Sequence, residues 1–227
     1  MNNLFFDKLK KDNKKINCLI LGCGPSLCNI NEEYIKKLSE DHLIITIKQA
    51  YLKFGEYSDF QFFNCNNISF YERKKAHFIC CSPTIPASGL WGKQEIDLFY
   101  HMSGHPKRMS DFENLEDFFK KESMGKYWGP GIMMEIVLPF VYNLGVKKIV
   151  TAGWDYHKNE KEIEHFFHEN ERIFFKNKGN LPYQGENLES IKNSKKINSF
   201  FASKNISLEC IESDKCFLDS SIKRIKK

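Results

Sequence analysis

Short apolar runs that end at glycine or at polar residues are the feature that most constrains the fold of this chain. The first run, residues 16–21, reads Ile-Asn-Cys-Leu-Ile-Leu and stops at Gly22. Runs of the same kind cover residues 43–47, 59–63, 77–81, 147–152 and 206–211. Apolar runs of this length are typical of strands buried on both faces of a parallel sheet.

Helical patterns alternate with these runs. They cover residues 31–39, 132–144, 158–178 and 188–203. In the second of them, Pro139 predicts a kink and Gly145 predicts the end of the helix. The alternation predicts an α/β fold, with a single Rossmann-like domain built on a mostly parallel sheet. The length of 227 residues suits one such domain.

The chain divides into three parts by composition. We expect a polar leader at residues 1–15, the Rossmann-like domain at 16–216 and a basic tail at 217–227. Within the domain, residues 84–128 have no clean period and predict an insertion or a lid over a site. The tail is interpreted either as a solvated, disordered terminus or as a peripheral contact with anionic lipid at the inner face of the membrane.

Composition and charge exclude several classes of protein. The 34 Lys and Arg residues against 29 Asp and Glu give a net charge of only +5, and their scatter argues against a nucleic-acid binder. No apolar run approaches the roughly 20 residues of a membrane span, and we expect no signal peptide, because lysines interrupt the first 15 residues. The 8 cysteines include no C-x-x-C pair, so we expect reduced thiols, no metal site and a cytoplasmic location.

Polar or glycine-rich residues follow five of the predicted strands. These strand ends are Gly22–Ser26, Lys48-Gln49, Asn64–Asn67, Ser82-Pro83 and Gly153–His157. The carboxyl ends of parallel strands lie along one edge of the sheet, and ligands bind beyond that edge. Unpaired polar groups would cost stability in a core, so the pattern predicts a ligand site at this edge.

The loop from Gly22 to Ser26 is the most specific of these ends. Gly22 and Gly24 allow a positive φ and a close backbone approach, and the helix that follows offers N–H groups to an anion. A ligand phosphate fits such a loop. The alternative is a tight turn without a ligand, because the loop is neither G-x-G-x-x-G nor a P-loop.

Other candidate residues have two interpretations each. Asn64 and its neighbours either contact a base or ribose or form a turn. Asp155 either serves a sugar hydroxyl, a metal or a proton transfer, or caps the next helix. His157 either donates to a leaving phosphate or titrates near neutral pH. Glu186 either acts as a base or as a ligand for a sugar, or interacts with the positive end of a helix. Trp128 and Trp154 either stack on a ligand or pack in the core.

Three blocks in order carry a family resemblance: Gly22–Leu27, Gly129–Gly131 with the apolar helix after it, and Lys147–Tyr156. Together they resemble the bacterial CMP-sialic acid-dependent sialyltransferases and related proteins, including Kdo transferases and 6-hydroxymethylpterin pyrophosphokinase relatives. The resemblance covers about residues 16–215. It implies a Rossmann-like domain of the GT-A-variant type with a mobile lid and a CMP-linked ligand, and it requires no cofactor or metal.

The resemblance and the strand ends together imply the residues that bind the donor. These are Gly22, Cys23, Gly24, Pro25, Ser26, Lys48, Gln49, Asn64, Ser82, Gly129, Pro130, Gly131, Gly153, Trp154, Asp155 and Tyr156. Two positions depart from the family. Lys48 stands where the sialyltransferases have Asn, and Gly185-Glu186 stands where they have Gly and a general-base His.

The resulting hypothesis is a glycosyltransferase that moves an acidic sugar (sialic acid, Kdo or a related nonulosonate) from a CMP-activated donor to a cell-surface glycan or glycolipid, as in lipooligosaccharide or capsule biosynthesis. His157 would assist departure of the CMP phosphate, and Glu186 or Asp155 would receive the acceptor proton. Two alternatives stay open: a Mg²⁺-dependent pyrophosphokinase or other phosphotransferase, and a non-catalytic nucleotide-sugar-binding protein.

Overall fold

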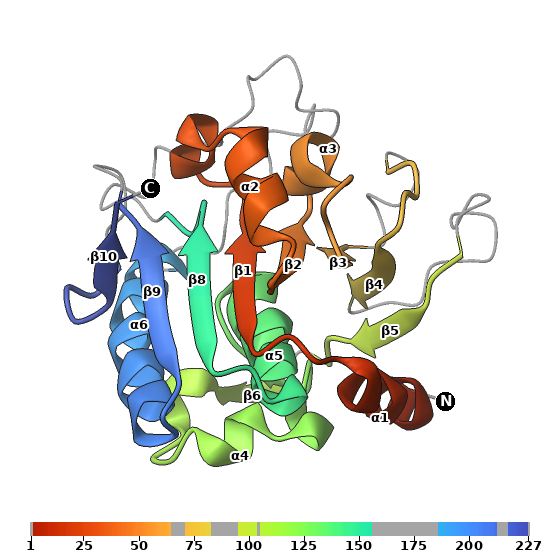
Figure 1. Cartoon of the computed structure of the whole chain (residues 1–227). Helices are drawn as coiled ribbons and strands as arrows, with labels where there is room; N and C mark the ends of the chain where they lie inside the picture. The colour runs from red at the N-terminus through yellow and green to blue at the C-terminus, as the bar shows by residue number, and fades with distance from the viewer. Residues whose placement is uncertain are drawn as a thin grey trace, which may run out of the picture.

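We describe the chain from a computed structural model that covers residues 2–64, 71–82, 95–103, 105–155, 186–212 and 218–226. Eight strands form its central sheet: β1 (Asn17–Leu21), β2 (His42–Ile47), β3 (Phe60–Phe63), β4 (His77–Ser82), β5 (Leu98–His101), β8 (Lys148–Ala152), β9 (Ser207–Ile211) and β10 (Lys223–Ile225). Their order is β10-β9-β8-β1-β2-β3-β4-β5, and every pairing is parallel (Figure 1). The predicted α/β fold with a mostly parallel sheet is confirmed.

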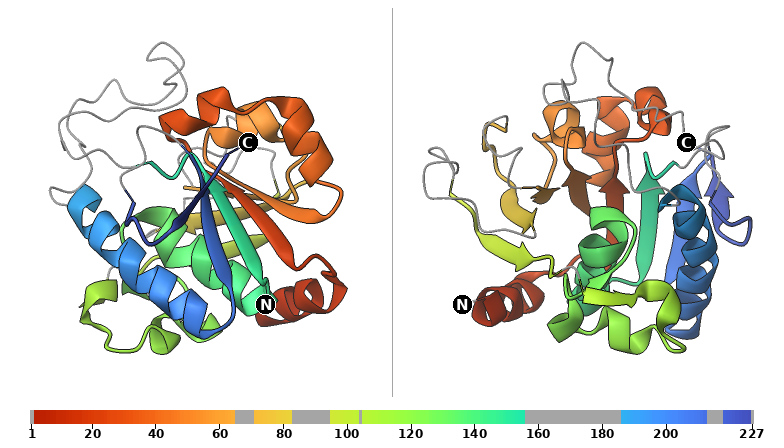
Figure 2. Two further views of the ribbon diagram at one scale, coloured as in Figure 1. Left: turned by 60° about the vertical axis from the view of Figure 1, so that its left-hand side comes forward. Right: turned by 180° about the vertical axis from the view of Figure 1, so that it is seen from behind.

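Helices cover both faces of this sheet (Figures 1 and 2). One face carries η1 (Pro25–Asn29), α2 (Glu32–Leu38) and α3 (Ala50–Phe54). The other carries α1 (Asn2–Asp12), α4 (Glu116–Phe119), α5 (Leu138–Leu144) and α6 (Glu186–Ser203). Strand side chains alternate between the two cores, so that Leu19 packs on the first face and Ile20 on the second. None of the helices within the described ranges has the length and apolar character of a membrane span.

The helix predicted over residues 132–144 forms in two parts. Its beginning, η5 (Met133–Val137), is a π-helical turn, and α5 continues it. Pro139 explains the change, because proline has no N–H and its ring would clash with the Glu135 carbonyl in a regular α-helix. In the wider turn the Leu138 N–H donates to the Met133 carbonyl instead. Gly145 ends α5 with φ +86°, as predicted.

Three segments differ from the expected organisation. The leader contains α1, whose Phe6 is buried in the core. The irregular segment contains β5 and a second, two-stranded parallel sheet of β6 (His105–Arg108) and β7 (Tyr127–Trp128). The tail contains β10, which pairs with β9, so the expectation of a disordered terminus is wrong. The predicted helix at 158–178 and the segment 83–94 lie outside the described residues. The lid over a site and the contact of the tail with a membrane stay predictions.

Candidate functional site

The loops after β1 and β8 meet where the strand order of the sheet changes direction. From β1 the order runs through β2 to β5 on one side and through β8 to β10 on the other. In open parallel sheets, such a switch point is where ligands bind. The Gly22 N–H donates to the Ala152 carbonyl at 2.7 Å, and the Gly24 N–H donates to the Gly153 carbonyl at 2.7 Å. The two loops are therefore in direct backbone contact.

Glycine is required for this contact. A methyl group at Gly24 would lie 2.6 Å from Asp155 Oδ2, and one at Gly22 would overlap the Gly153 carbonyl oxygen. The positive φ belongs to Gly153, at +68°, whereas Gly24 is extended with φ −71° and Gly22 also lacks a positive φ. Gly22 and Gly24 therefore do not use the positive φ that glycine allows. The close approach is present, but the partner is the chain's own loop.

Asp155 occupies the position expected for a ligand anion at the start of η1. Its Oδ2 accepts a hydrogen bond from the Ser26 N–H at 2.7 Å. The Ser26 hydroxyl in turn accepts from the Gly153 N–H at 2.8 Å, and Ser26 is buried. The prediction that this N–H is free for a phosphate is wrong in this structure. Asp155 thus bonds the first turn of η1, the helix after β1, whereas the expected cap was on the helix after Asp155, which lies outside the described residues.

Cys23, Lys48 and Gln49 lie beside the contact. The Cys23 thiol donates to the Ile47 carbonyl at 3.2 Å and lies 3.6 Å from Gln49 Oε1. Burial raises the pKa of this thiol, and the positive charge of Lys48 opposes that rise. The charge of Lys48 is therefore close to the loop that begins at Gly22.

The backbone holds Lys48 in place from both sides. Its N–H donates to the Phe62 carbonyl at 2.8 Å, and its carbonyl accepts from Gln61 Nε2 at 2.9 Å. Lys48 has φ +50°, a conformation that costs energy for a residue with a side chain. No carboxylate in the described parts of the chain pairs with its ammonium group. The backbone of Lys48 is therefore fixed at the carboxyl edge of the sheet.

The loop Gly129–Gly131 is held by a carboxylate that sequence reasoning missed. The Gly129 N–H donates to Glu135 Oε1 at 3.0 Å, and Gly131 has φ +78°. Glu135 and Pro130 are both buried. A signal was available in the sequence, because Glu135 is the one charged residue in the segment 132–144.

The two tryptophans have different environments. Trp154 is 3% exposed and packs in the core behind the sheet, so the alternative of core packing holds for it. Trp128 is half-buried, and the Arg108 guanidinium lies over its ring at 4.9 Å. Arg108 also pairs with Glu189, one turn after the start of α6 at Glu186. This link connects the first turn of α6 with Trp128, next to Gly129.

The remaining predicted residues are less well defined. Asn64 follows β3, and its Oδ1 is buried without a hydrogen-bond partner in the described part of the chain. Ser82 is the buried last residue of β4. Tyr156, His157 and the side chains of Pro25 and Glu186 lie outside the described residues. Within the described ranges, no three histidine, cysteine, aspartate or glutamate side chains form a group that could hold a metal ion.

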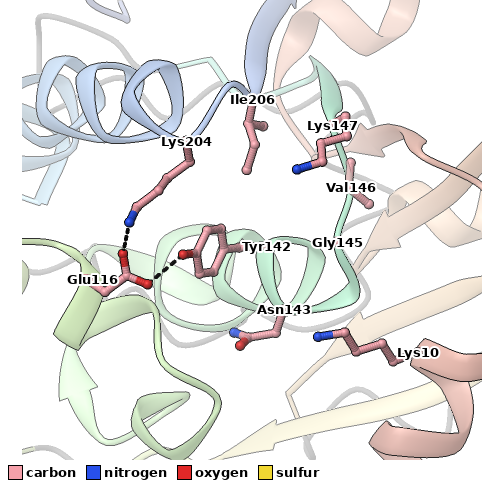
Figure 3. A pocket seen from close by; sticks show the side chains of 9 residues that line it. All are labelled: Lys10, Glu116, Tyr142, Asn143, Gly145, Val146, Lys147, Lys204 and Ile206. Atoms are coloured by element: carbon pink, nitrogen blue, oxygen red, sulfur yellow. Dashed lines mark hydrogen bonds and ion pairs between the residues drawn. The ribbon is translucent and has the colours of Figure 1, made fainter.

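A pocket of about 390 Å³ lies at the opposite edge of the sheet (Figure 3). In it, Glu116 accepts from the Tyr142 hydroxyl at 2.6 Å and pairs with Lys204. Burial and this hydrogen bond raise the pKa of Tyr142 to about 12. Lys147 precedes β8 at the pocket, and α5 and α6 end there, so the lysines offset the negative ends of helices. The pocket is separate from the predicted site residues.

Comparison with known proteins gives one match in structure. No protein-family model matches the sequence, and no curated protein matches it. The chain is similar to the sialyltransferase CstII from Campylobacter jejuni, solved in complex with the substrate analogue cytidine-5'-monophosphate. The identity is 15%, the alignment covers 90% of this chain and 82% of that chain, and the TM-score is 0.48.

Proposed function

We propose that the protein is a glycosyltransferase that moves an acidic sugar from a CMP-activated donor to a glycan or glycolipid acceptor. The observation that carries the proposal is the meeting of Gly22–Ser26 with Gly153–Asp155 at the switch point between β1 and β8. Nucleotides bind at such points in parallel α/β sheets. The sequence blocks that resemble CMP-dependent sialyltransferases include both loops.

Lys48 has a defined role in this proposal. CMP as a leaving group carries one phosphate, and an ammonium group can balance its charge without a divalent metal. The Lys48 charge acts on the thiol of Cys23 in the loop after β1. Gln49 and Asn64 follow neighbouring strands and offer amide donors and acceptors for the sugar or base.

The proton transfers are assigned to residues other than Asp155. Its carboxylate already accepts from Ser26, so we assign to it the joining of the two loops. In the proposed reaction, His157 donates a proton to the departing CMP phosphate, while Glu186 receives the proton of the acceptor hydroxyl. The bond between the anomeric carbon and the phosphate oxygen breaks, and a bond from that carbon to the acceptor oxygen forms.

Calorimetry with CMP and release of CMP from CMP-Neu5Ac and CMP-Kdo test the proposal, with UMP as the control ligand. We expect CMP to bind and UMP to bind more weakly. Lys48→Gln should weaken CMP binding by about tenfold, because a charge-assisted contact is lost. Lys36→Gln, on the exposed face of α2, should leave it unchanged. Absence of binding by every cytosine nucleotide would overturn the proposal, and Mg²⁺-dependent consumption of ATP would replace it with a phosphotransferase.

A further inference from the structure

Glu135 is a buried carboxylate in an apolar segment. It is 5% exposed, and the other residues of the π-helical turn Met133–Val137 are buried apolar side chains. Carboxylates are rarely buried to this extent, because their removal from water is unfavourable unless hydrogen bonds or charges offset it. An apolar residue would be expected here if the helix had only to pack against the sheet.

The contacts of Glu135 point to the candidate site. Its Oε1 accepts from the Gly129 N–H at 3.0 Å. Its charge also acts on the Cys81 thiol, whose pKa burial and the neighbouring Cys80 raise and which Glu135 raises further. Lys48 acts on the same thiol in the opposite direction. Glu135 is therefore near both the Gly129–Gly131 loop and the carboxyl end of β4.

The loop fits closely against the stem of this side chain. A methyl group at Gly129 would lie 3.1 Å from Glu135 Cγ and 3.3 Å from Phe118 Cζ. Glycine at 129 thus allows the loop to approach the carboxylate. The π-helical turn before Pro139 determines where Glu135 lies, because it changes the spacing of side chains along the helix. The glycine at 129 and the π-helical turn therefore both allow the hydrogen bond from the Gly129 N–H to Glu135.

We propose that Glu135 is a positioning residue for the donor site: its carboxylate fixes the Gly129–Gly131 loop in the conformation that encloses the nucleotide. This inference rests on the proposed function. A carboxylate only accepts hydrogen bonds, so it holds the Gly129 N–H without competing donors. Glutamine keeps one acceptor oxygen and adds an NH₂ group that the buried site must accommodate, whereas alanine removes the acceptor altogether.

The test compares Glu135→Gln and Glu135→Ala with Glu209→Gln, a buried carboxylate elsewhere in the sheet. The readouts are CMP affinity by calorimetry and exchange of the Gly129 amide by NMR, both measured on folded protein. We expect Glu135→Ala to weaken CMP binding by about tenfold or more and to lose protection of Gly129. Glu135→Gln should recover part of both, and Glu209→Gln should change neither.

The outcomes separate this inference from the proposed function. If the wild-type protein binds no CMP, the proposed function fails and this inference fails with it. If the wild type binds CMP and the folded Glu135 variants bind it within twofold, this inference alone is overturned. Should Glu135→Ala fail to fold, Glu135→Gln still decides, because equal CMP affinity together with unchanged protection of Gly129 contradicts the proposal.

Discussion

Ser26 and Asp155 join two loops that are 129 residues apart in the sequence: the Ser26 N–H donates to Asp155 Oδ2 at 2.7 Å. The Ser26 hydroxyl accepts from the Gly153 N–H, so the link is made in both directions. Two hydrogen bonds between buried or half-buried groups fix the relative position of the loops after β1 and β8. The chain's own hydrogen bonds therefore hold the two loops together at the switch point.

Removal of the Asp155 carboxylate should weaken this link measurably. Asp155→Ala leaves the Ser26 N–H without its acceptor, which should lower the free energy of unfolding by about 1 to 3 kcal/mol. Asp155→Asn keeps an acceptor oxygen, so its free energy of unfolding should fall by less than that of Asp155→Ala. Urea unfolding measures both, with Asp117→Ala on the exposed surface of α4 as a control that should behave as wild type. Equal stability of Asp155→Ala and wild type would contradict the structural role.

Glycine is needed at Gly22 for a close backbone approach and at Gly145 for a positive φ. A methyl group at Gly22 would overlap the Gly153 carbonyl, so Gly22→Ala should lower the free energy of unfolding by about 1 to 3 kcal/mol or more. Gly145 has φ +86° but open space around it, so Gly145→Ala should cost only about 1 kcal/mol of backbone strain. Thermal and urea unfolding of both variants give the comparison. A larger loss of unfolding free energy for Gly145→Ala than for Gly22→Ala would show that the loop at Gly22 can move away from the loop at Gly153.

Glu209 should make stability depend on pH. Burial raises the pKa of this carboxyl, but hydrogen bonds from Lys223 at 2.9 Å and from Lys148 at 3.0 Å outweigh it, and the pKa lies below its ordinary value of 4.5. The stabilisation is therefore complete above about pH 4.5 and is lost as pH falls through the lower pKa of the folded state.

The measurement is the free energy of unfolding of wild type and Glu209→Gln from pH 7 to pH 3. At pH 7 the variant should be less stable by about 1 kcal/mol, the low end for bonds to charged groups, because both lysines reach water. The difference should shrink as the pH falls below about 4.5. A difference that is constant over this range would show that the charge of Glu209 contributes nothing.

The cysteines should differ in reactivity. Burial raises the pKa of Cys18 and Cys81 well above the ordinary value and also raises that of Cys23, whereas Cys28 is exposed. Thiolate is the reactive form, and each unit by which the pKa rises lowers the population of thiolate about tenfold. Of these four thiols, iodoacetamide at pH 8 should therefore label Cys28 first, as measured by peptide mass spectrometry, and it should label all four in urea. Rapid labelling of Cys23 in the folded protein would mean that its loop opens.

The central strands were predictable because a strand that is buried on both faces needs an apolar run in its own sequence. Every residue of β2 is buried, and the sequence there is an uninterrupted apolar run apart from its first residue and Thr46. The edge strands β5 and β10 have no such apolar run. The β10 residues Lys223–Ile225 form a strand because β9 offers a free edge, which no property of those three residues reveals.

The meeting of the strand ends at one edge of the sheet was predictable, but the contacts between them were less so. The strand ends with glycine or polar residues do lie at the carboxyl edge, because all the strands are parallel. That Asp155 would bond Ser26, and that Glu135 would hold Gly129, depends on how distant segments pack. Glu135 is the clearer lesson, since a single carboxylate in an apolar helix needs a partner, and that partner is a backbone N–H.

The position of β1 in the middle of the sheet has a consequence during synthesis. One side of β1 is completed early by β2, but the other side requires β8, which is made more than a hundred residues later. Until then the nascent chain carries an apolar strand with an open edge, a form that readily associates with other chains. Fragments that end before residue 148 should therefore aggregate or bind chaperones. Productive folding should begin only once the segment 148–155 has emerged from the ribosome.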